Sequence, residues 1–305
     1  MIQIKNITKK FPSVTALDNI SLKIKEKDFF GLLGPNGAGK STLMNLLVGY
    51  LIPEEGEILI DNLKISGESL SIKNKIGLVP QSLALYDDLS ALENLEIFGS
   101  LFDIAGKQLK ESIDEKLNSV ELYERRKDKV KTFSGGMKRR LNLIAGLLHD
   151  PLVLLCDEPT VGVDPQSRNA IFDFLMKLNE EGKTIVYTTH YMEEAERLCN
   201  RIAIIDMGKI IAEGTVQELI HHLPYEQTIL INKNQTTLHH TEKFKSYGIL
   251  IDEQDHFELK PAEGFTLSSF FKMIETEGIT NQSIGIKRPS LEALFLHLTG
   301  RRLRD

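Results

Sequence analysis

Two kinds of hydrophobic pattern predict strands in the first two thirds of the chain. Apolar and polar positions alternate in residues 2–7 and 21–27, which is typical of antiparallel strands with one face in solvent. Residues 29–33, 76–79 and 152–156 are apolar almost throughout, and this indicates strands that are buried on both faces. By the same criteria we expect further strands at residues 57–61, 184–188, 202–205 and 209–212.

Between these strands the hydrophobic period becomes helical. Residues 90–122 begin with a capping-box pattern, in which Glu93 stands three positions after Ser90. They also carry an apolar stripe that we expect to lie mostly in a core. The stripe consists of Leu92, Leu95, Phe98, Leu101 and Phe102. Further helices are expected at residues 136–148, 165–178 and 192–198. Strands that alternate with helices predict an α/β fold around a mostly parallel sheet, with an antiparallel β subdomain and an inserted helical subdomain at about residues 88–150.

The last part of the chain has a different order of elements. We expect strands at residues 228–231, 257–260 and 283–287, a polar segment after the first of them, and helices at 265–275 and 291–298. This order predicts a small α+β domain. The domain boundaries are therefore placed at 1–222 and 223–305, and the second domain could regulate, dimerise or buttress the first.

Composition narrows the class of protein. The chain has 305 residues, of which 41% are hydrophobic and 26% charged, as in ordinary globular proteins. Its net charge of −6 argues against binding nucleic acid through bulk electrostatics. The N-terminus lacks the apolar core of a signal peptide, and the sequence contains no apolar run long enough to span a membrane. We expect a cytoplasmic protein, so any membrane part would be supplied by a separate chain.

One segment between a buried strand and a helix carries phosphate-binding chemistry. It fits G-x-x-x-x-G-K-[ST], and its glycines let backbone N–H groups surround a polyphosphate. The lysine is expected along the β- and γ-phosphates, the serine hydroxyl on Mg²⁺, and the threonine beside the same phosphates. A chance match is the alternative, and the flanking elements make it remote. The residues are Gly34, Pro35, Asn36, Gly37, Ala38, Gly39, Lys40, Ser41 and Thr42.

Two carboxylates follow the second apolar strand, where open α/β sheets bind ligands. We assign Asp157 to Mg²⁺, through water, and Glu158 to the base that polarises an attacking water. Two groups are needed because a carboxylate that is tied to the metal is a poor base. Alone, the pair could be ordinary turn residues before a proline, but the phosphate loop argues against that interpretation.

Residues 132–141, Thr-Phe-Ser-Gly-Gly-Met-Lys-Arg-Arg-Leu, precede this acidic pair and resemble the signature motif of ATP-binding cassette proteins. The resemblance covers about residues 2–220 and includes the other motifs of that family in their usual order. These are Phe11 as the aromatic residue before the phosphate loop, Gln81 in the glutamine loop, Ser134, Gly135 and Gly136 in the signature, Asp164 in the aspartate loop, and His190 as the switch histidine. Met137 and Val161 depart from common residues at positions that vary among members.

The resemblance implies a head-to-tail dimer of cassettes that binds two ATP molecules. The signature residues of one copy would close over ATP held by the other, and the second cassette could be the same chain or a different one. Phe11 would stack on adenine, His190 would act near the γ-phosphate, and Gln81 would join Ser41 and Asp157 around Mg²⁺. Each of these residues also has an ordinary structural interpretation when it is considered alone, for example packing under a strand or capping a turn.

Residues 160–168 and 289–300 look like the cassette subunits of drug, lipid or polysaccharide exporters, whose permease is a separate membrane chain. The resemblance therefore implies an export role at the inner face of the cell membrane. The exposed edge of the stripe at residues 92–102, with the segment after Gln81, is the candidate groove for a permease helix. The alternatives are a soluble cassette ATPase that acts on nucleic acid or ribosomes, and an inactive cassette used as a binding module.

Overall fold

The structure is a computed structural model, and it describes residues 1–65, 70–102, 104, 106–223 and 227–300. The chain forms two compact units, of which the first runs from Met1 to Val216 and the second begins at Gln217. Helix α8 (Val216–Ile220) lies between this point and the boundary expected at 222/223, which stays a prediction. Each unit is described by itself below.

The first unit is built on a six-stranded sheet with the order β10-β9-β3-β8-β7-β6. The strands from β9 to β6 in this order run parallel, and β10 pairs with β9 as an antiparallel hairpin. Strands β3 and β7 are buried at every position, as the apolar runs at these places predict, and β8 is also buried throughout although three of its six residues are threonines. Their bounds are β3 (Phe29–Leu33), β6 (Ile76–Val79), β7 (Val153–Asp157), β8 (Thr184–Thr189), β9 (Arg201–Asp206) and β10 (Lys209–Gly214).

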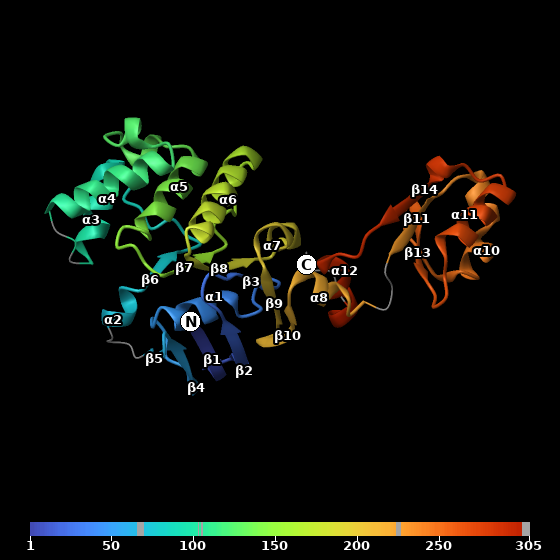
Figure 1. The fold of residues 1–305 in the computed structure, drawn as a ribbon, viewed down its shortest axis with the longest axis horizontal. Helices are drawn as coiled ribbons and strands as arrows, with labels where there is room; N and C mark the ends of the chain where they lie inside the picture. Colours follow the sequence, from blue (N-terminus) through green and yellow to red (C-terminus); the bar gives the residue numbers. More distant parts are fainter. Residues whose placement is uncertain (66–69, 103, 105, 224–226, 301–305) are drawn as a thin grey trace. The chain divides into compact units, whose positions relative to one another are not determined.

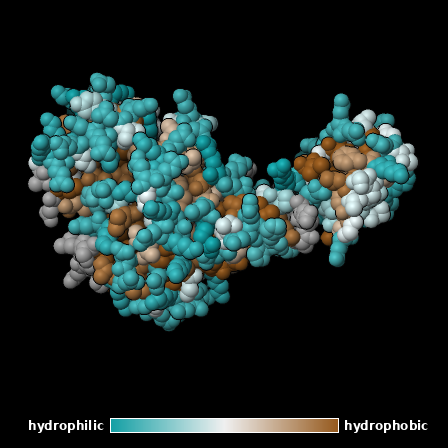
Figure 2. Space-filling model, in the orientation of Figure 1, coloured by the Kyte–Doolittle hydropathy of each residue, from teal (hydrophilic) through white to brown (hydrophobic). Residues whose placement is uncertain are grey.

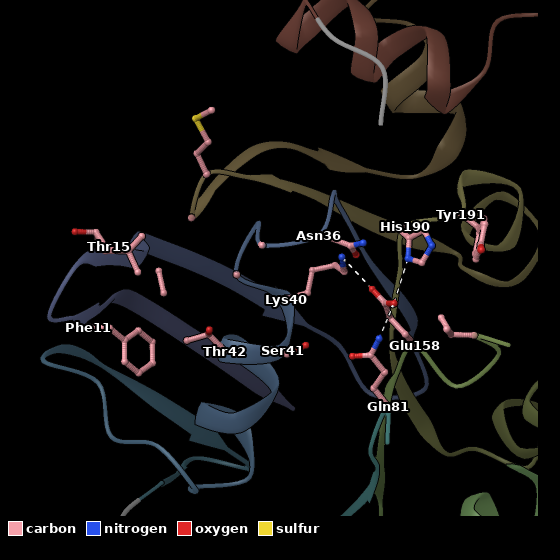
Figure 3. Close-up of a pocket in the computed structure, with 17 residues that line it drawn as sticks. Phe11, Thr15, Asn36, Lys40, Ser41, Thr42, Gln81, Glu158, His190 and Tyr191 are labelled. Carbon is pink, nitrogen blue, oxygen red and sulfur yellow. Dashed lines mark hydrogen bonds and ion pairs between the residues drawn. The ribbon is translucent and has the colours of Figure 1, made fainter. Parts of the chain in front are cut away.

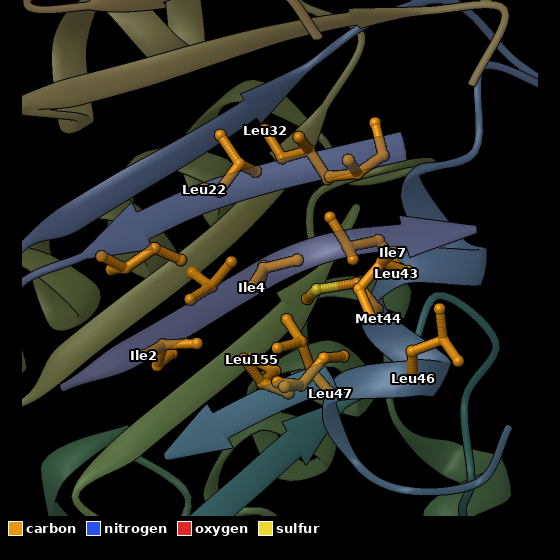
Figure 4. Packing of buried hydrophobic residues seen from close by; sticks show 14 of the residues in the cluster. Ile2, Ile4, Ile7, Leu22, Leu32, Leu43, Met44, Leu46, Leu47 and Leu155 are labelled. Atoms are coloured by element: carbon orange, nitrogen blue, oxygen red, sulfur yellow. The ribbon is translucent and has the colours of Figure 1, made fainter. Parts of the chain in front are cut away.

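A four-stranded antiparallel sheet with the order β2-β1-β4-β5 forms the second layer of this unit. Apolar residues of both sheets and of helix α1 (Lys40–Leu47) form one buried cluster, in which Leu43 and Met44 of α1 lie close to Ile4 and Ile7 of β1 (Figure 4). The first turn of α1 is thereby fixed between the two sheets. The strands are β1 (Ile2–Phe11), β2 (Val14–Ile24), β4 (Glu55–Ile60) and β5 (Leu63–Lys64).

A helical block forms a separate core within the first unit (Figure 1). The capping box predicted before α3 is present, because Ser90 Oγ accepts from the Glu93 N–H while the Glu93 carboxylate accepts from the Ser90 N–H. Of the predicted stripe, Leu95 is fully buried and Leu101 is 70% exposed. The helices of the block are α3 (Ala91–Ser100), α4 (Gly106–Ser119) and α5 (Gly135–Ala145), and the others of this unit are α2 (Leu70–Lys73), α6 (Pro165–Glu180) and α7 (Met192–Leu198).

The second unit contains an antiparallel sheet with the order β12-β13-β11-β14. Ile229 and Leu259 of this sheet pack with Phe244 of α10 and Phe270 of α11 in a buried cluster. Between the strands expected at residues 228–231 and 257–260, the sequence predicted only a polar segment without helix or strand. This is wrong, since two short helices and a strand lie there. Helix α9 contributes no buried or half-buried apolar residue, α10 contributes Phe244, and β12 contributes Leu250 and Ile251, which are too few for a periodic signal. The elements are β11 (Thr228–Asn232), α9 (Gln235–His239), α10 (Thr241–Lys245), β12 (Gly248–Asp252), β13 (His256–Pro261), α11 (Leu267–Thr276), β14 (Ile284–Lys287) and α12 (Leu291–Thr299).

The surface is mainly hydrophilic on the face seen in Figure 2, with hydrophobic patches between the polar residues. Both cysteines, Cys156 and Cys199, are buried free thiols, and burial raises the pKa of each thiol far above its ordinary value. Among the described residues, no helix is long and apolar enough to cross a membrane.

Candidate active site

The predicted phosphate loop connects β3 to α1, and its backbone packs tightly against the neighbouring strand. A Cβ atom at Gly34 would lie 2.2 Å from the Ile205 carbonyl oxygen, so only glycine fits this position. Gly39 caps α1 with a φ of 110°, a conformation that L side chains rarely adopt. The loop therefore turns sharply into the N-terminal end of α1, where free N–H groups favour an anion.

Lys40 is held inside this loop. Lys40 is only 4% exposed, and its Nζ donates to the carbonyl oxygens of Gly34 (2.7 Å) and Pro35 (3.0 Å). The same Nζ lies 3.1 Å from Glu158 Oε1. The lysine thus connects the phosphate loop to the carboxylate that the sequence predicts as the base.

Glu158 is the point at which the predicted catalytic residues meet (Figure 3). Gln81 Nε2 donates to Glu158 Oε2 over 3.3 Å, and His190 Nδ1 lies 3.1 Å from the same oxygen. Since an ionised carboxylate only accepts, we assign the proton of His190 to Nδ1. Glu158 has a φ of 44°, and its backbone N–H donates to Thr188 Oγ1 at 2.9 Å. A left-handed glutamate is strained, and such strain is common at functional sites.

Asp157 lies at the end of β7, where its Oδ1 accepts from the Thr188 hydroxyl at 2.6 Å. It is buried and does not line the cavity described below, whereas Ser41 and Gln81 do. A serine hydroxyl, an amide oxygen and a carboxylate are all hard oxygen donors, so this set has the chemistry that suits Mg²⁺.

A cavity of about 870 Å³ runs along the phosphate loop. Glu158, Gln81 and His190 lie at one end of it, and Phe11 lies at the other, with Thr42 between them in the view of Figure 3. Phe11 is 40% exposed and lines the cavity, so its ring is accessible to a base, and Lys9 Nζ lies 5.6 Å from the ring centre. The cavity is large enough for a nucleotide. The sequence did not reveal its further lining residues, which are Val14, Thr15, Ala16, Val161, Tyr191, Met207 and Gly208.

The β9–β10 hairpin brings part of this unpredicted lining to the loop. The Gly208 N–H donates to the Ala38 carbonyl oxygen (3.0 Å), and the Asp18 N–H donates to the Gly208 carbonyl oxygen (2.8 Å). These contacts tie the hairpin turn to the phosphate loop and to β2. Strands were expected at residues 202–205 and 209–212, but only the fold shows that the turn between them reaches the cavity.

The signature residues lie elsewhere in the same unit. Ser134 caps α5 by accepting from the Met137 N–H (3.3 Å), while Gly135 and Gly136 form its first turn. A Cβ atom at Gly136 would lie 2.2 Å from Ser167 Oγ in the first turn of α6.

Asp164 caps that neighbouring helix. The Ser167 N–H donates to Asp164 Oδ1 (2.9 Å) and holds the pKa of this carboxyl below its ordinary value. The structure thus brings the predicted signature residues close to Asp164. Ser134, Gly135, Gly136 and Asp164 do not line the cavity that contains Lys40 and Glu158.

Comparison with known proteins gives a consistent result. The family model described as "ABC transporter" matches residues 17–161. The chain is 42% identical to the linearmycin resistance ATP-binding protein LnrL of Bacillus subtilis, over 100% of both chains. It is 37% identical to the Nod factor export ATP-binding protein I of Cupriavidus metallidurans, over 100% of this chain and 99% of the relative.

A solved structure shares the fold of the first unit. It is an ATP-binding cassette in a dimeric, post-hydrolysis state bound to ADP and Pi, and it is 33% identical to this chain with a TM-score of 0.64. The match covers 70% of this chain and 98% of that one.

Proposed function

Because the chain belongs to the family of ATP-binding proteins of ABC transporters, we propose that it powers an exporter whose membrane-spanning part is a separate chain. The chain binds ATP and is an ABC ATPase that couples hydrolysis to transport. The observation that supports the assignment of individual residues is the meeting of Lys40, Gln81 and His190 at the Glu158 carboxylate.

We assign the hydrolytic roles as follows. Glu158 accepts the proton of the attacking water, and the imidazole of His190, held by Glu158, donates toward charge that develops on the γ-phosphate. Lys40 binds the β- and γ-phosphate oxygens together with the backbone N–H groups of the loop. Since Lys40 and Glu158 are both more than nine-tenths buried, their charges act in a medium of low dielectric, where electrostatic stabilisation is strong.

Mg²⁺ would be held by Ser41, Gln81 and Asp157, and it would neutralise charge on the phosphates. Thr42 supports the same phosphate groups, while Phe11 stacks on the adenine ring. Gln81 contacts Glu158 as well, so its amide group is suited to sense both the metal and the base.

A second cassette completes the site in this proposal. Ser134, Gly135, Gly136 and Asp164 lie away from the cavity of their own chain, which is consistent with their acting on the nucleotide of a partner. The related cassette bound to ADP and Pi is itself dimeric. The N-terminal end of α5 begins with the exposed residues Ser134 and Gly135, and N–H groups at a helix N-terminus favour a phosphate, here that of the facing copy. The partner is a second copy of this chain or another cassette.

A groove of about 310 Å³ in the first unit is the proposed contact with the membrane chain. Its lining is mostly apolar and includes Leu78, Ala84, Phe98 and Leu101, which come from β6, the segment after Gln81, and α3 with its C-terminal cap. Phe98, Leu101 and Ala84 belong to the two segments from which the sequence leads us to expect such a groove, while Leu92 and Leu95 of the stripe do not line it. A short helix of the membrane chain fits such a groove. Its movement would act on the segment that carries Gln81, because Pro80 and Ala84 on either side of Gln81 line the groove. The protein would then lie at the inner face of the cell membrane.

The names of two relatives, a linearmycin resistance protein and a Nod factor export protein, support the direction of transport. A charged side chain in the groove, Ala84→Glu, should abolish copurification with the membrane chain while ATP binding persists. Copurification of that variant at the parental level would refute the groove assignment.

The proposed base is tested with Glu158→Gln in the full chain, beside Glu180→Gln, an exposed glutamate at the end of α6. We expect the first variant to bind ATP normally, to lose about 10²–10⁴-fold in kcat, and to accumulate as a dimer with ATP. The control should retain the parental rate and the parental dimer equilibrium. Hydrolysis by Glu158→Gln at the parental rate would remove Glu158 from the role of base, and a strictly monomeric ATP complex would refute the dimer.

A further inference from the structure

A buried carboxylate outside the proposed mechanism lies in α7. Glu194 is 4% exposed, and its Oε2 accepts from Tyr187 Oη (2.9 Å) and from Thr189 Oγ1 (2.7 Å). Its Oε1 accepts from Thr160 Oγ1 at 2.9 Å. Arg168 Nε lies 3.9 Å from the same Oε1. Three hydroxyl groups and one guanidinium group therefore surround a single side chain.

The groups around Glu194 come from the segments that carry the proposed catalytic residues. Thr160 follows Glu158 by two positions, and Thr189 directly precedes His190. The Thr189 hydroxyl also accepts from the Tyr191 N–H (2.9 Å), so the residues on both sides of His190 are fixed through this one hydroxyl. Glu194 thus connects the chain beyond Glu158 to the chain that flanks His190.

Arg168 extends the same connection to the first turn of α6, which Asp164 caps. Its Nη2 donates to the Val163 carbonyl oxygen (3.5 Å), and its guanidinium group lies 5.6 Å from the centre of the Tyr191 ring. The segments that hold Glu158, Asp164 and His190 therefore meet around one carboxylate.

A buried carboxylate is energetically unfavourable at this position unless its charge is compensated. Burying a charge costs several kcal/mol before it is compensated, and an apolar residue of similar size would avoid that cost. A carboxylate, however, accepts hydrogen bonds and does not donate them, so it fixes the direction of every hydroxyl that points at it. Burial, and then the charge of Glu194, raises the pKa of Tyr187, which keeps the phenol protonated as a donor. The hydrogen bonds around Glu194 therefore fix the positions of the surrounding side chains more than they increase the free energy of unfolding.

We propose that Glu194 is a positioning residue for ATP hydrolysis, which holds Glu158 and His190 at the separation that the reaction needs. This inference rests on the roles proposed for those two residues. The hydrogen bonds to Glu194 involve residues 160, 187 and 189, and none of them involves the phosphate loop. Loss of the carboxylate should therefore affect the chemical step and leave nucleotide binding intact.

The first test compares Glu194→Gln with Glu193→Gln in the full chain. The two variants make the same chemical change at adjacent positions of α7, one buried and one exposed. Glu194→Gln should lower kcat by about 10- to 100-fold, because a misplacement of about 1 Å can cost about 10²-fold, while KM and ADP affinity stay at parental values. Glu193→Gln should match the parent throughout. Parental kcat in Glu194→Gln, or a loss of nucleotide affinity equal to the loss of kcat, would overturn the proposal.

A second pair of variants keeps the test decisive if Glu194→Gln does not fold. Thr189→Val removes the hydroxyl that joins Glu194 to the backbone beside His190, and Thr189→Ser retains it. We expect Val to reproduce the fall in kcat and Ser to restore most of the rate. The double variant Thr189→Val with Glu194→Gln should be no slower than the slower single variant, since both remove the same connection. Equal rates for Val, Ser and the parent would overturn the proposal.

Glu158→Gln, assayed in parallel, separates the two levels of the argument. If it is inactive while Glu194→Gln and Thr189→Val hydrolyse at the parental rate, only the positioning role fails. If Glu158→Gln itself retains the parental rate, the catalytic role proposed for Glu158 fails, and with it the basis for a positioning residue.

Discussion

Replacing Lys40 should destabilise the nucleotide-free protein as well as weaken its binding of ATP. Lys40 and Glu158 are 4% and 5% exposed and form an ion pair of 3.1 Å. Breaking a buried pair by removing one partner costs about 3–5 kcal/mol, because the remaining charge is uncompensated. Gln81 and His190 still contact Glu158, so we expect a smaller loss of about 2–3 kcal/mol for Lys40→Ala.

A double-mutant cycle measures this effect. The free energy of unfolding is obtained from urea titrations of the parent, Lys40→Ala, Glu158→Gln and the double variant, followed by circular dichroism because the chain has no tryptophan. Since Glu158→Gln removes the charge that Lys40→Ala leaves unpaired, the double variant should be more stable than the sum of the single losses predicts, by about 1–2 kcal/mol.

The matched control is Lys5→Ala. Lys5 and Glu57 form an ion pair of 3.0 Å, but their side chains are 49% and 36% exposed. We expect no measurable change in stability there, because water screens the pair. Strict additivity of the Lys40 and Glu158 losses, or a loss for Lys40→Ala as small as that for Lys5→Ala, would refute the reasoning.

Two further predictions concern the phosphate loop and the groove. Gly34→Ala should abolish ATP binding in a calorimetric titration, because the new Cβ would force the loop away from the Ile205 carbonyl oxygen, and parental affinity would contradict this packing argument. His149 lines the groove, and burial lowers its pKa from the ordinary value of 6.5. The unfolded chain therefore binds the extra proton first, and stability falls as pH drops through and below 6.5. His149→Phe should lose less stability than the parent between about pH 7.5 and about pH 5.5 in urea titrations, and equal losses would exclude His149 as the cause.

The regular elements of the first unit are the part of the fold that could be predicted from the sequence. The apolar run at residues 29–33 and the capping box at Ser90 appear where they were expected, because each depends on neighbouring residues alone. The second unit was harder to predict. Its helices α9 and α10 and strand β12 are short. Phe244 of α10 and Leu250 of β12 pack in a cluster with residues far away in the chain, and Asn234, which caps α9, donates to Ser283 Oγ.

The candidate site likewise contains residues that the sequence predicts and one important residue that it does not. Lys40 and Glu158 stand in motifs whose spacing carries their chemistry, and the structure places their side chains 3.1 Å apart. Glu194 gave no such signal, since a glutamate among the charged residues of a short helix has the pattern of an exposed position. Its partners are up to 34 positions away, so only the folded chain reveals that it is buried and hydrogen-bonded.

The two buried cysteines provide a selective reporter of unfolding. Because only a thiolate reacts readily with disulfide reagents, the native chain should resist modification, and each thiol should react when the structure around it opens. Cys156 lies in β7 and Cys199 follows α7, so both belong to the first unit. The rate of thiol modification would therefore follow the opening of the ATP-binding unit alone, however the second unit unfolds.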